Sequence, residues 1–196
     1  EYGNVEQKDL PLTEEHSLNP VSPYAVARVS QELLSRIYAH GYGMDVVMTR
    51  SFNHIGPFQK DIFVLPSFIR QILEIKNNIV NNNHLTTGDI SIIRDFIDVR
   101  DVASAYYKLL TLGEKGEVYN VCSGMGWSLR EIIDKICSLL EVHVHIVPDA
   151  GLFRPDDNRV IIGANEKLKK AVQWQPEYSL EETLQEMIIY WKNQMK

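Results

Sequence analysis

The chain has 196 residues, of which 44% are hydrophobic and 23% charged, and its formal net charge is −6. The acidic balance argues against nucleic-acid binding, for which a basic domain or stripe is typical. No apolar run approaches the roughly 20 residues that cross a bilayer, and no signal peptide is visible, so we expect no membrane partner. Two cysteines, Cys122 and Cys137, are too few for a disulfide framework and predict a reducing, cytoplasmic location.

The first part of the chain predicts a long surface loop. Residues 1–22 are polar, contain two prolines and show no hydrophobic period. The chain begins at Glu1 rather than at a methionine, within what reads as a strand end and a turn. We therefore expect a fragment of a longer protein.

A helix is predicted over residues 23–40. Pro23 suits the first helical turn, where a missing N–H costs nothing, and Gly41 and Gly43 suit the end. Apolar residues recur at helical spacing, namely Val26, Val29, Leu33 and Ile37. Residues 45–52 then read as a buried strand.

The rest of the chain predicts helices that alternate with short strands. The expected helices begin at Pro66, Asp98, Ser128, about Asn165 and Ser179; the expected strands cover 84–87, 92–97, 118–122 and 142–147. Ser128 with Glu131 and Ser179 with Glu182 form capping boxes, and Gly113 ends the helix that Asp98 begins. This alternation predicts an α/β fold with parallel strand pairing.

Tyr24 and Arg28 are the first candidates for chemistry. Residues four apart share one face of a helix, so the phenol and the guanidinium are neighbours, together with Gln31 and Ser35. Lowering a tyrosine pKa by about three units requires roughly 4 kcal/mol of phenolate stabilisation, part of which a fixed cation supplies. The alternative is an ordinary amphipathic helix with an exposed Tyr–Arg pair.

Several segments, in this order, resemble the extended short-chain dehydrogenase/reductase family. They are Glu1–Gly3, Ser22–Tyr24, Arg50–Pro57, Arg94–Val102, Val118–Gly124 and Arg154–Asp156. Phe52–His54 is typical of the branch that holds the GDP-mannose 4,6-dehydratases and the GDP-4-keto-6-deoxy-mannose reductases. Residues 162–168 and 174–176 look more like the reductases.

The resemblance implies the C-terminal part of a Rossmann-like enzyme with its smaller α/β substrate-binding domain. Residues 1–60 would be a remnant of the dinucleotide-binding domain, with the catalytic helix and the strand after it. Residues 61–196 would be mainly the substrate-binding domain, with about 98–122 returning to the Rossmann part. The Gly-rich turn that binds the cofactor pyrophosphate is absent from this sequence.

The resemblance also implies site residues for NAD or NADP. Tyr24 would be the catalytic tyrosine, which also touches the cofactor. Arg28 stands where the family has a lysine that binds the nicotinamide ribose; arginine keeps the charge but hydrogen-bonds differently. His54 would contact the cofactor near its nicotinamide end, and its alternative is a histidine satisfied by loop carbonyls.

Three residues are implied to bind the substrate, a nucleotide-diphosphate sugar that is expected to be GDP-linked. Asn53 suits a diphosphate or a sugar hydroxyl because its amide donates and accepts; its alternative is a turn former. Arg94 and Arg154 suit the diphosphate because guanidinium binds phosphate oxygens in a bidentate manner. The alternatives are ion pairs, of Arg94 with Asp95 or Asp98 and of Arg154 with Asp156 or Asp157.

The implied function is an NAD(P)-dependent nucleotide-sugar oxidoreductase, with GDP-4-keto-6-deoxy-mannose reductase favoured. GDP-mannose 4,6-dehydratase, another epimerase or dehydratase, and a non-catalytic orphan fragment are the alternatives. A homodimer through the Tyr24 helix is plausible on the same resemblance. We expect no metal site, because His143 and His145 lack an acidic or cysteine partner nearby in the sequence.

Overall fold

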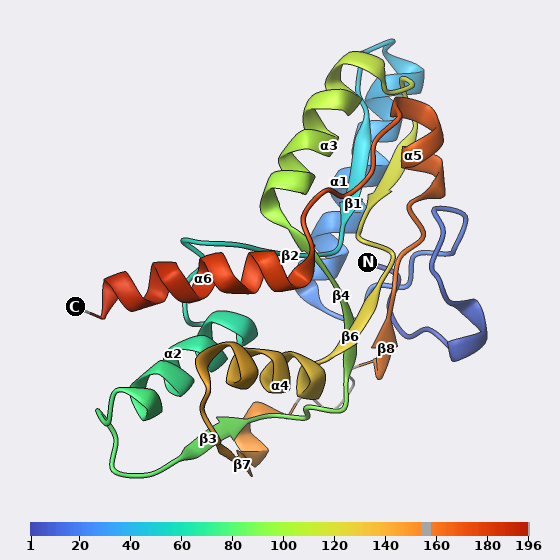
Figure 1. Ribbon diagram of the computed structural model, residues 1–196. Coiled ribbons are helices and arrows are strands. Elements are labelled where there is room, and N and C mark those ends of the chain that lie inside the picture. The colour runs from blue at the N-terminus through green and yellow to red at the C-terminus, as the bar shows by residue number, and fades with distance from the viewer. Residues whose placement is uncertain (154–157, 196) are drawn as a thin grey trace.

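The computed structural model describes residues 1–153 and 158–195 (Figure 1). Its helices are η1 (Gln7–Asp9), α1 (Pro23–Gly41), α2 (Val64–Lys76), α3 (Val99–Leu112), α4 (Leu129–Leu140), η2 (Ala150–Leu152), α5 (Glu166–Val172) and α6 (Leu180–Gln194). Its strands are β1 (Met48–Ser51), β2 (Asn53–Ile55), β3 (His84–Thr87), β4 (Ile93–Asp98), β5 (Val118–Val121), β6 (Gly126–Ser128), β7 (His145–Pro148) and β8 (Val160–Ile161). The α/β prediction is confirmed.

Strand β4 organises the sheet that lies at the middle of the molecule. It pairs in parallel with β2, where Asn53 faces Phe96, and in parallel with β8. It also pairs with β6, which runs antiparallel to it. Two further parallel pairs are separate in the described residues, β1 with β5 and β3 with β7. The pairing is therefore mainly parallel, and the antiparallel β6 was not predicted.

The larger core lies among α2, α4 and α6, which gather on the lower part of the molecule in Figure 1. Each of these helices repeats apolar residues three or four apart, so one face of each can be buried completely. Side chains with no exposed surface from these helices include Ile69, Ile72, Leu73, Ile132, Ile136, Leu184 and Met187. Removing this apolar surface from water is the main favourable term for the region.

A smaller core lies between α3, β5 and α5. Val102, Ala105 and Leu109 of α3 pack in the cluster that includes Tyr119 and Trp174. The indole Nε1 of Trp174 donates to the carbonyl oxygen of Asp101 at 3.2 Å, so its buried polar atom is satisfied.

The predicted helix starts are confirmed except that of α2, which begins at Val64 rather than at Pro66. Both capping boxes form, with Ser128 and Ser179 each exchanging hydrogen bonds with the glutamate three residues later. Asp98 caps α3 through a 2.7 Å bond from the backbone N–H of Arg100. These signals are local in sequence and do not depend on distant parts of the chain.

Helix α1 has its predicted bounds, but its apolar stripe is not buried. Leu33 and Ile37 are 54% and 57% exposed, whereas the buried residues are Ala25, Glu32 and Ala39. Within this chain, α1 therefore faces the rest of the molecule through a stripe of small and charged residues. In the described part of the chain, no helix is both long and apolar enough to span a membrane.

The first 22 residues are a loop in the main, as predicted, but they are not all at the surface. Tyr2 and Leu12 are buried. Leu12 forms a parallel bridge with Gly163, with hydrogen bonds of 2.8 Å on both sides of it. The segment is thus part of the packed structure between α1 and the sheet.

Candidate active site

Tyr24 and Arg94 line one cavity. Tyr24 lies in the first turn of α1, which Ser22 caps by accepting the backbone N–H of Ala25 at 3.1 Å. The phenol is 76% exposed, and the cavity beside it has a volume of about 300 Å³. Arg94, Asn158 and Ile161 lie on its wall with residues of the N-terminal segment. The structure thus brings Tyr24 and Arg94, which are far apart in the sequence, to the same cavity.

Arg28 is oriented by two polar neighbours. Its Nη1 donates to the Gln31 side-chain oxygen at 2.7 Å, and its Nε lies 3.4 Å from the carboxylate of Glu1. Glu1 also lines the cavity around Tyr24. A guanidinium has five N–H donors, so these two bonds leave donors for a ligand.

Asn53 and His54 lie on β2 rather than at the cavity wall. The Asn53 amide donates to the carbonyl oxygen of Asp95 at 3.1 Å, and Asn53 belongs to the β2–β4 ladder. Its alternative role as a turn former is therefore wrong. His54 is exposed. The ligand-binding roles of Asn53 and His54 remain predictions. Neither residue lines the cavity of Tyr24 and Arg94.

The two carboxylates proposed as ion-pair partners of Arg94 are engaged by other groups. Asp98 binds Arg100 through both oxygens, at 2.9 and 2.8 Å, and accepts the hydroxyl of Thr183 at 2.7 Å. Arg94 itself donates from Nη1 to the carbonyl oxygen of Ile93 at 2.9 Å. Arg154, the other predicted diphosphate ligand, lies outside the described residues.

Asp95 is a buried carboxylate that the sequence did not single out as a site residue. It has no exposed surface and accepts hydrogen bonds from Ser123 N and Oγ, Gly124 N and Gly163 N, between 2.6 and 3.2 Å. Burial raises the pKa of Asp95 above its ordinary value, against the effect of these donors. Asp95 therefore links β4 to the turn after β5 and to the segment after β8.

A second buried polar group holds the N-terminal segment against β5. The Tyr2 hydroxyl donates to the Asn120 side-chain oxygen at 2.6 Å, and the Asn120 amide donates to the Leu12 carbonyl oxygen at 2.8 Å. Burial raises the pKa of Tyr2 above its ordinary value. In the sequence, Tyr2 was noted only as part of a segment that resembles the family. Its partners, Asn120 and Arg50, are too distant along the chain for a sequence pattern to predict them.

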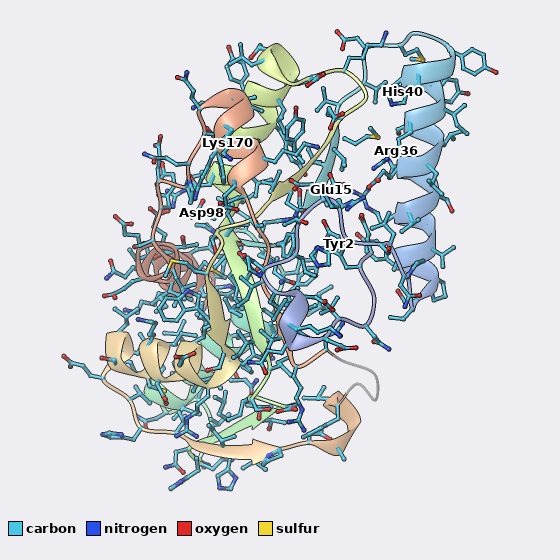
Figure 2. The ribbon with its side chains drawn as sticks, turned by 90° about the vertical axis from the view of Figure 1, so that its right-hand side faces the viewer. Tyr2, Glu15, Arg36, His40, Asp98 and Lys170 are labelled. Carbon is cyan, nitrogen blue, oxygen red and sulfur yellow. The ribbon has the colours of Figure 1, made fainter. Side chains whose placement is uncertain are left out.

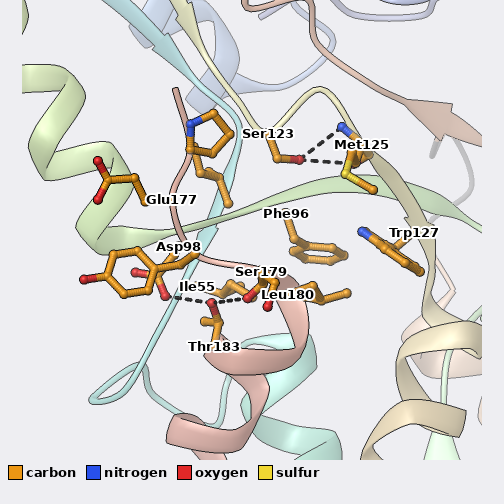
Figure 3. A pocket seen from close by; sticks show the side chains of 13 residues that line it. Ile55, Phe96, Asp98, Ser123, Met125, Trp127, Glu177, Ser179, Leu180 and Thr183 are labelled. Carbon is orange, nitrogen blue, oxygen red and sulfur yellow. Dashed lines mark hydrogen bonds between the residues drawn. The ribbon is translucent and has the colours of Figure 1, made fainter. Parts of the chain in front are cut away.

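Another cavity, of about 330 Å³, lies between β4, the segment before α6 and the turn after β5 (Figure 3). Phe96, Trp127 and Leu180 make its walls largely apolar, and Ser123 and Tyr178 also line it. Of the predicted site residues that the structure describes, none lines it. Tyr178 in this lining has the guanidinium of Arg100 over its ring, 3.6 Å from the centroid, but that guanidinium is already paired with Asp98 and Glu186.

The described residues offer neither a metal site nor an accessible thiol. No group of three or more His, Cys, Asp or Glu side chains there could hold a metal ion. Cys122 is fully buried, and burial strongly raises the pKa of its thiol, which makes the thiolate inaccessible at neutral pH. The candidate chemistry therefore depends on Tyr24 and its neighbours.

Several known proteins are similar to this chain in both sequence and fold. The family model for GDP-mannose 4,6 dehydratase matches residues 1–187. GDP-6-deoxy-D-mannose reductase of Pseudomonas aeruginosa is 39% identical over 195 residues, which cover 100% of this chain and 64% of that protein.

Two solved structures extend this likeness to three dimensions. The structure of RMD from Pseudomonas aeruginosa complexed with NADPH has a TM-score of 0.93 at 40% identity and covers 98% of this chain and 64% of that one. UDP-glucose 4-epimerase from Thermotoga maritima with UDP-glucose has a TM-score of 0.87 at 27% identity and covers 100% and 61%. The chain spans less than two thirds of the length of each of these relatives. It belongs to the GDP-mannose 4,6 dehydratase family, within the extended short-chain dehydrogenase/reductases.

Proposed function

We propose that the natural protein containing this chain is an NAD(P)-dependent nucleotide-sugar oxidoreductase, and that this chain supplies its catalytic tyrosine and its substrate-binding part. The observation that carries the proposal is the shared cavity of Tyr24 and Arg94 in a chain of this family. One side chain can transfer a proton, and the other can bind an anion. In this proposal residues 1–60 and about 98–122 belong to the Rossmann part, and most of residues 61–196 to the substrate-binding domain.

Tyr24 acts as the proton donor in this scheme. When bound, NAD(P)H supplies the hydride that reaches the carbon of a sugar ketone, and the Tyr24 hydroxyl gives its proton to the ketone oxygen, which yields an alcohol. Arg28 favours the phenolate that remains, because a cation one helical turn away stabilises the charged form. The exposed phenol and the remaining N–H donors of Arg28 fit a flat nicotinamide nucleotide. His54 is proposed to touch the same cofactor.

Arg94 is proposed to bind the substrate diphosphate. A guanidinium keeps its charge and offers paired donors that match phosphate oxygens. Asn53 contributes from β2, held by its bond to the residue that follows Arg94. Arg154 has the same proposed role.

Among nucleotide sugars we favour a GDP-linked 4-keto-6-deoxyhexose, reduced by the reaction of a GDP-4-keto-6-deoxy-mannose reductase. The identity to the Pseudomonas aeruginosa reductase supports this choice. The second candidate is GDP-mannose 4,6-dehydratase, which the description of the matching family supports. A homodimer through α1 is part of the proposal, because Leu33 and Ile37 are exposed on that helix.

The test is turnover by the natural protein that contains this chain. With GDP-4-keto-6-deoxy-mannose and NADPH or NADH, we expect one cofactor to be oxidised for each ketone reduced. Consumption of GDP-mannose without net change in the cofactor would identify the dehydratase instead.

Tyr24→Phe tests the mechanism for either reaction. We expect kcat to fall by about 1000-fold, because a general acid contributes on that order, while KM changes by less than about threefold. Tyr38→Phe is the matched control, because it removes a phenol from the same helix without touching the cavity. A Tyr24→Phe variant with the wild-type rate would contradict the proposed function.

A further inference from the structure

Helix α1 is attached to strand β1 by a buried ion pair. Arg50 on β1 and Glu32 on α1 are only 4% and 7% exposed. The Nε and Nη2 atoms of Arg50 each donate to one oxygen of Glu32 at 2.8 Å. Such a two-point contact between a planar fork and a carboxylate fixes direction as well as distance.

The same guanidinium also binds the N-terminal segment. Its Nη1 donates to the Tyr2 hydroxyl at 3.0 Å and to the Glu14 carbonyl oxygen at 3.1 Å. In Figure 2, α1 stands at one side of the molecule, and Tyr2 lies in the segment between that helix and the sheet. Arg50 therefore joins three parts of the chain at one buried point.

This point lies between the two halves of the proposed site. Glu32 follows Tyr24 on α1 by about two helical turns. Arg50 precedes Asn53 by three residues, on the strand that leads into β2. A change in the Glu32–Arg50 geometry would move the phenol relative to the strands that carry Asn53 and, through β4, Arg94.

The electrostatics agree with a permanently formed pair. Burial alone would raise the pKa of Glu32, but the hydrogen bonds and charge of Arg50 outweigh it and hold that pKa below its ordinary value. Arg36 adds a 2.9 Å contact to the same carboxylate from within α1. Because the apolar stripe of α1 is exposed, polar contacts of this kind set the helix position in this chain.

We propose that Arg50 and Glu32 are positioning residues, which fix α1 so that the Tyr24 hydroxyl reaches the substrate carbonyl. The inference rests on the proposed function of Tyr24. A misplacement of about 1 Å at a reacting group can lower a rate by about 100-fold. Neither residue lines the cavity of Tyr24 and Arg94, so substrate binding should be nearly unchanged.

The test compares variants of the natural protein in single-turnover and steady-state assays. Arg50→Lys keeps the charge but loses the two-point contact, and Glu32→Gln keeps the shape but loses the charge. We expect each to lower kcat by about 100-fold, with KM within about twofold of wild type. Arg36→Gln is the control, because it removes a bond to the same carboxylate that does not connect the helix to the sheet.

A double-mutant cycle separates positioning from loss of structure. In a Tyr24→Phe background, Arg50→Lys should lower the residual rate by less than about threefold, because the group that it positions is already absent. An equal factor in both backgrounds would indicate general damage and overturn the inference. The same comparison with Glu32→Gln, in the wild-type and Tyr24→Phe backgrounds, measures this coupling a second time from the other partner of the ion pair.

The two proposals can fail separately. If Tyr24→Phe keeps the wild-type rate, the proposed function is wrong. If Tyr24→Phe is inactive while Arg50→Lys and Glu32→Gln are as active as Arg36→Gln, the proposed function stands and the positioning role is wrong.

Discussion

The region around α2, α4 and α6 and the region around α1 and α3 are held together in different ways. The first, here called the closed core, buries its apolar residues within the chain, as Ile72 and Ile136 show with no exposed surface. The second, here called the open layer, leaves Leu33 of α1 and Leu110 of α3 exposed, and α1 is attached through the ion pair of Arg50. Apolar surface gathered on one element marks a contact surface. We therefore expect the open layer to pack against further protein in the natural assembly, and the closed core to need none.

The largest effect on stability should come from the closed core. Ile136→Ala should lower the free energy of unfolding by about 3 kcal/mol, through lost burial and the cavity that remains. Chemical denaturation of the natural protein measures this. Ile189→Ala on α6 is the matched control, because Ile189 is largely exposed and its truncation should cost less than about 0.5 kcal/mol. Equal losses at both positions would mean that burial within the closed core is not what stabilises it.

An intermediate effect should appear on acidification. The folded-state pKa of Glu32 is lowered, so its contribution to stability is complete above the unfolded-state pKa of about 4.3 and is lost as the pH falls through the folded value. Asp98, which caps α3, shifts in the same direction. Amides of α1 and α3 should therefore lose hydrogen-exchange protection before those of α2, which no carboxylate caps. Glu32→Gln should abolish this early loss in α1, and unchanged behaviour would show that the pair does not hold the helix.

The smallest effect on stability should come from the exposed face of α1. Leu33→Gln should change the free energy of unfolding of a subunit by less than about 0.5 kcal/mol, because the side chain is already largely in water. The same change should weaken self-association, which sedimentation measures as a shift toward the monomer. A loss above about 1 kcal/mol without any change in association would mean that Leu33 packs within its own subunit.

Local signals in the sequence predicted the long helices and their starts. Capping residues such as Ser128 act on the N–H groups of the same helix, so their effect can be read from spacing. Strands β2, β6 and β8 were not predicted, because each has only two or three residues and exists through pairing with β4. A pattern of that length carries no period of its own.

Periodicity also cannot show which face of a helix is covered. It correctly placed the apolar residues of α1 on one side, but the side that this chain covers carries Glu32. Of the predicted site, the proximity of Tyr24 and Arg94 followed from the family resemblance, whereas Arg50 and Asp95 emerged as hubs only in three dimensions. Their partners come from segments that are far apart along the chain.

The most direct test of the account is a crystal structure of the natural protein with a GDP-linked sugar. We predict the diphosphate against Arg94 and the sugar beside the Tyr24 hydroxyl, in the cavity bordered by Ser22 and Ile161. A nucleotide sugar bound instead in the apolar cavity of Trp127, or with its sugar remote from Tyr24, would contradict it.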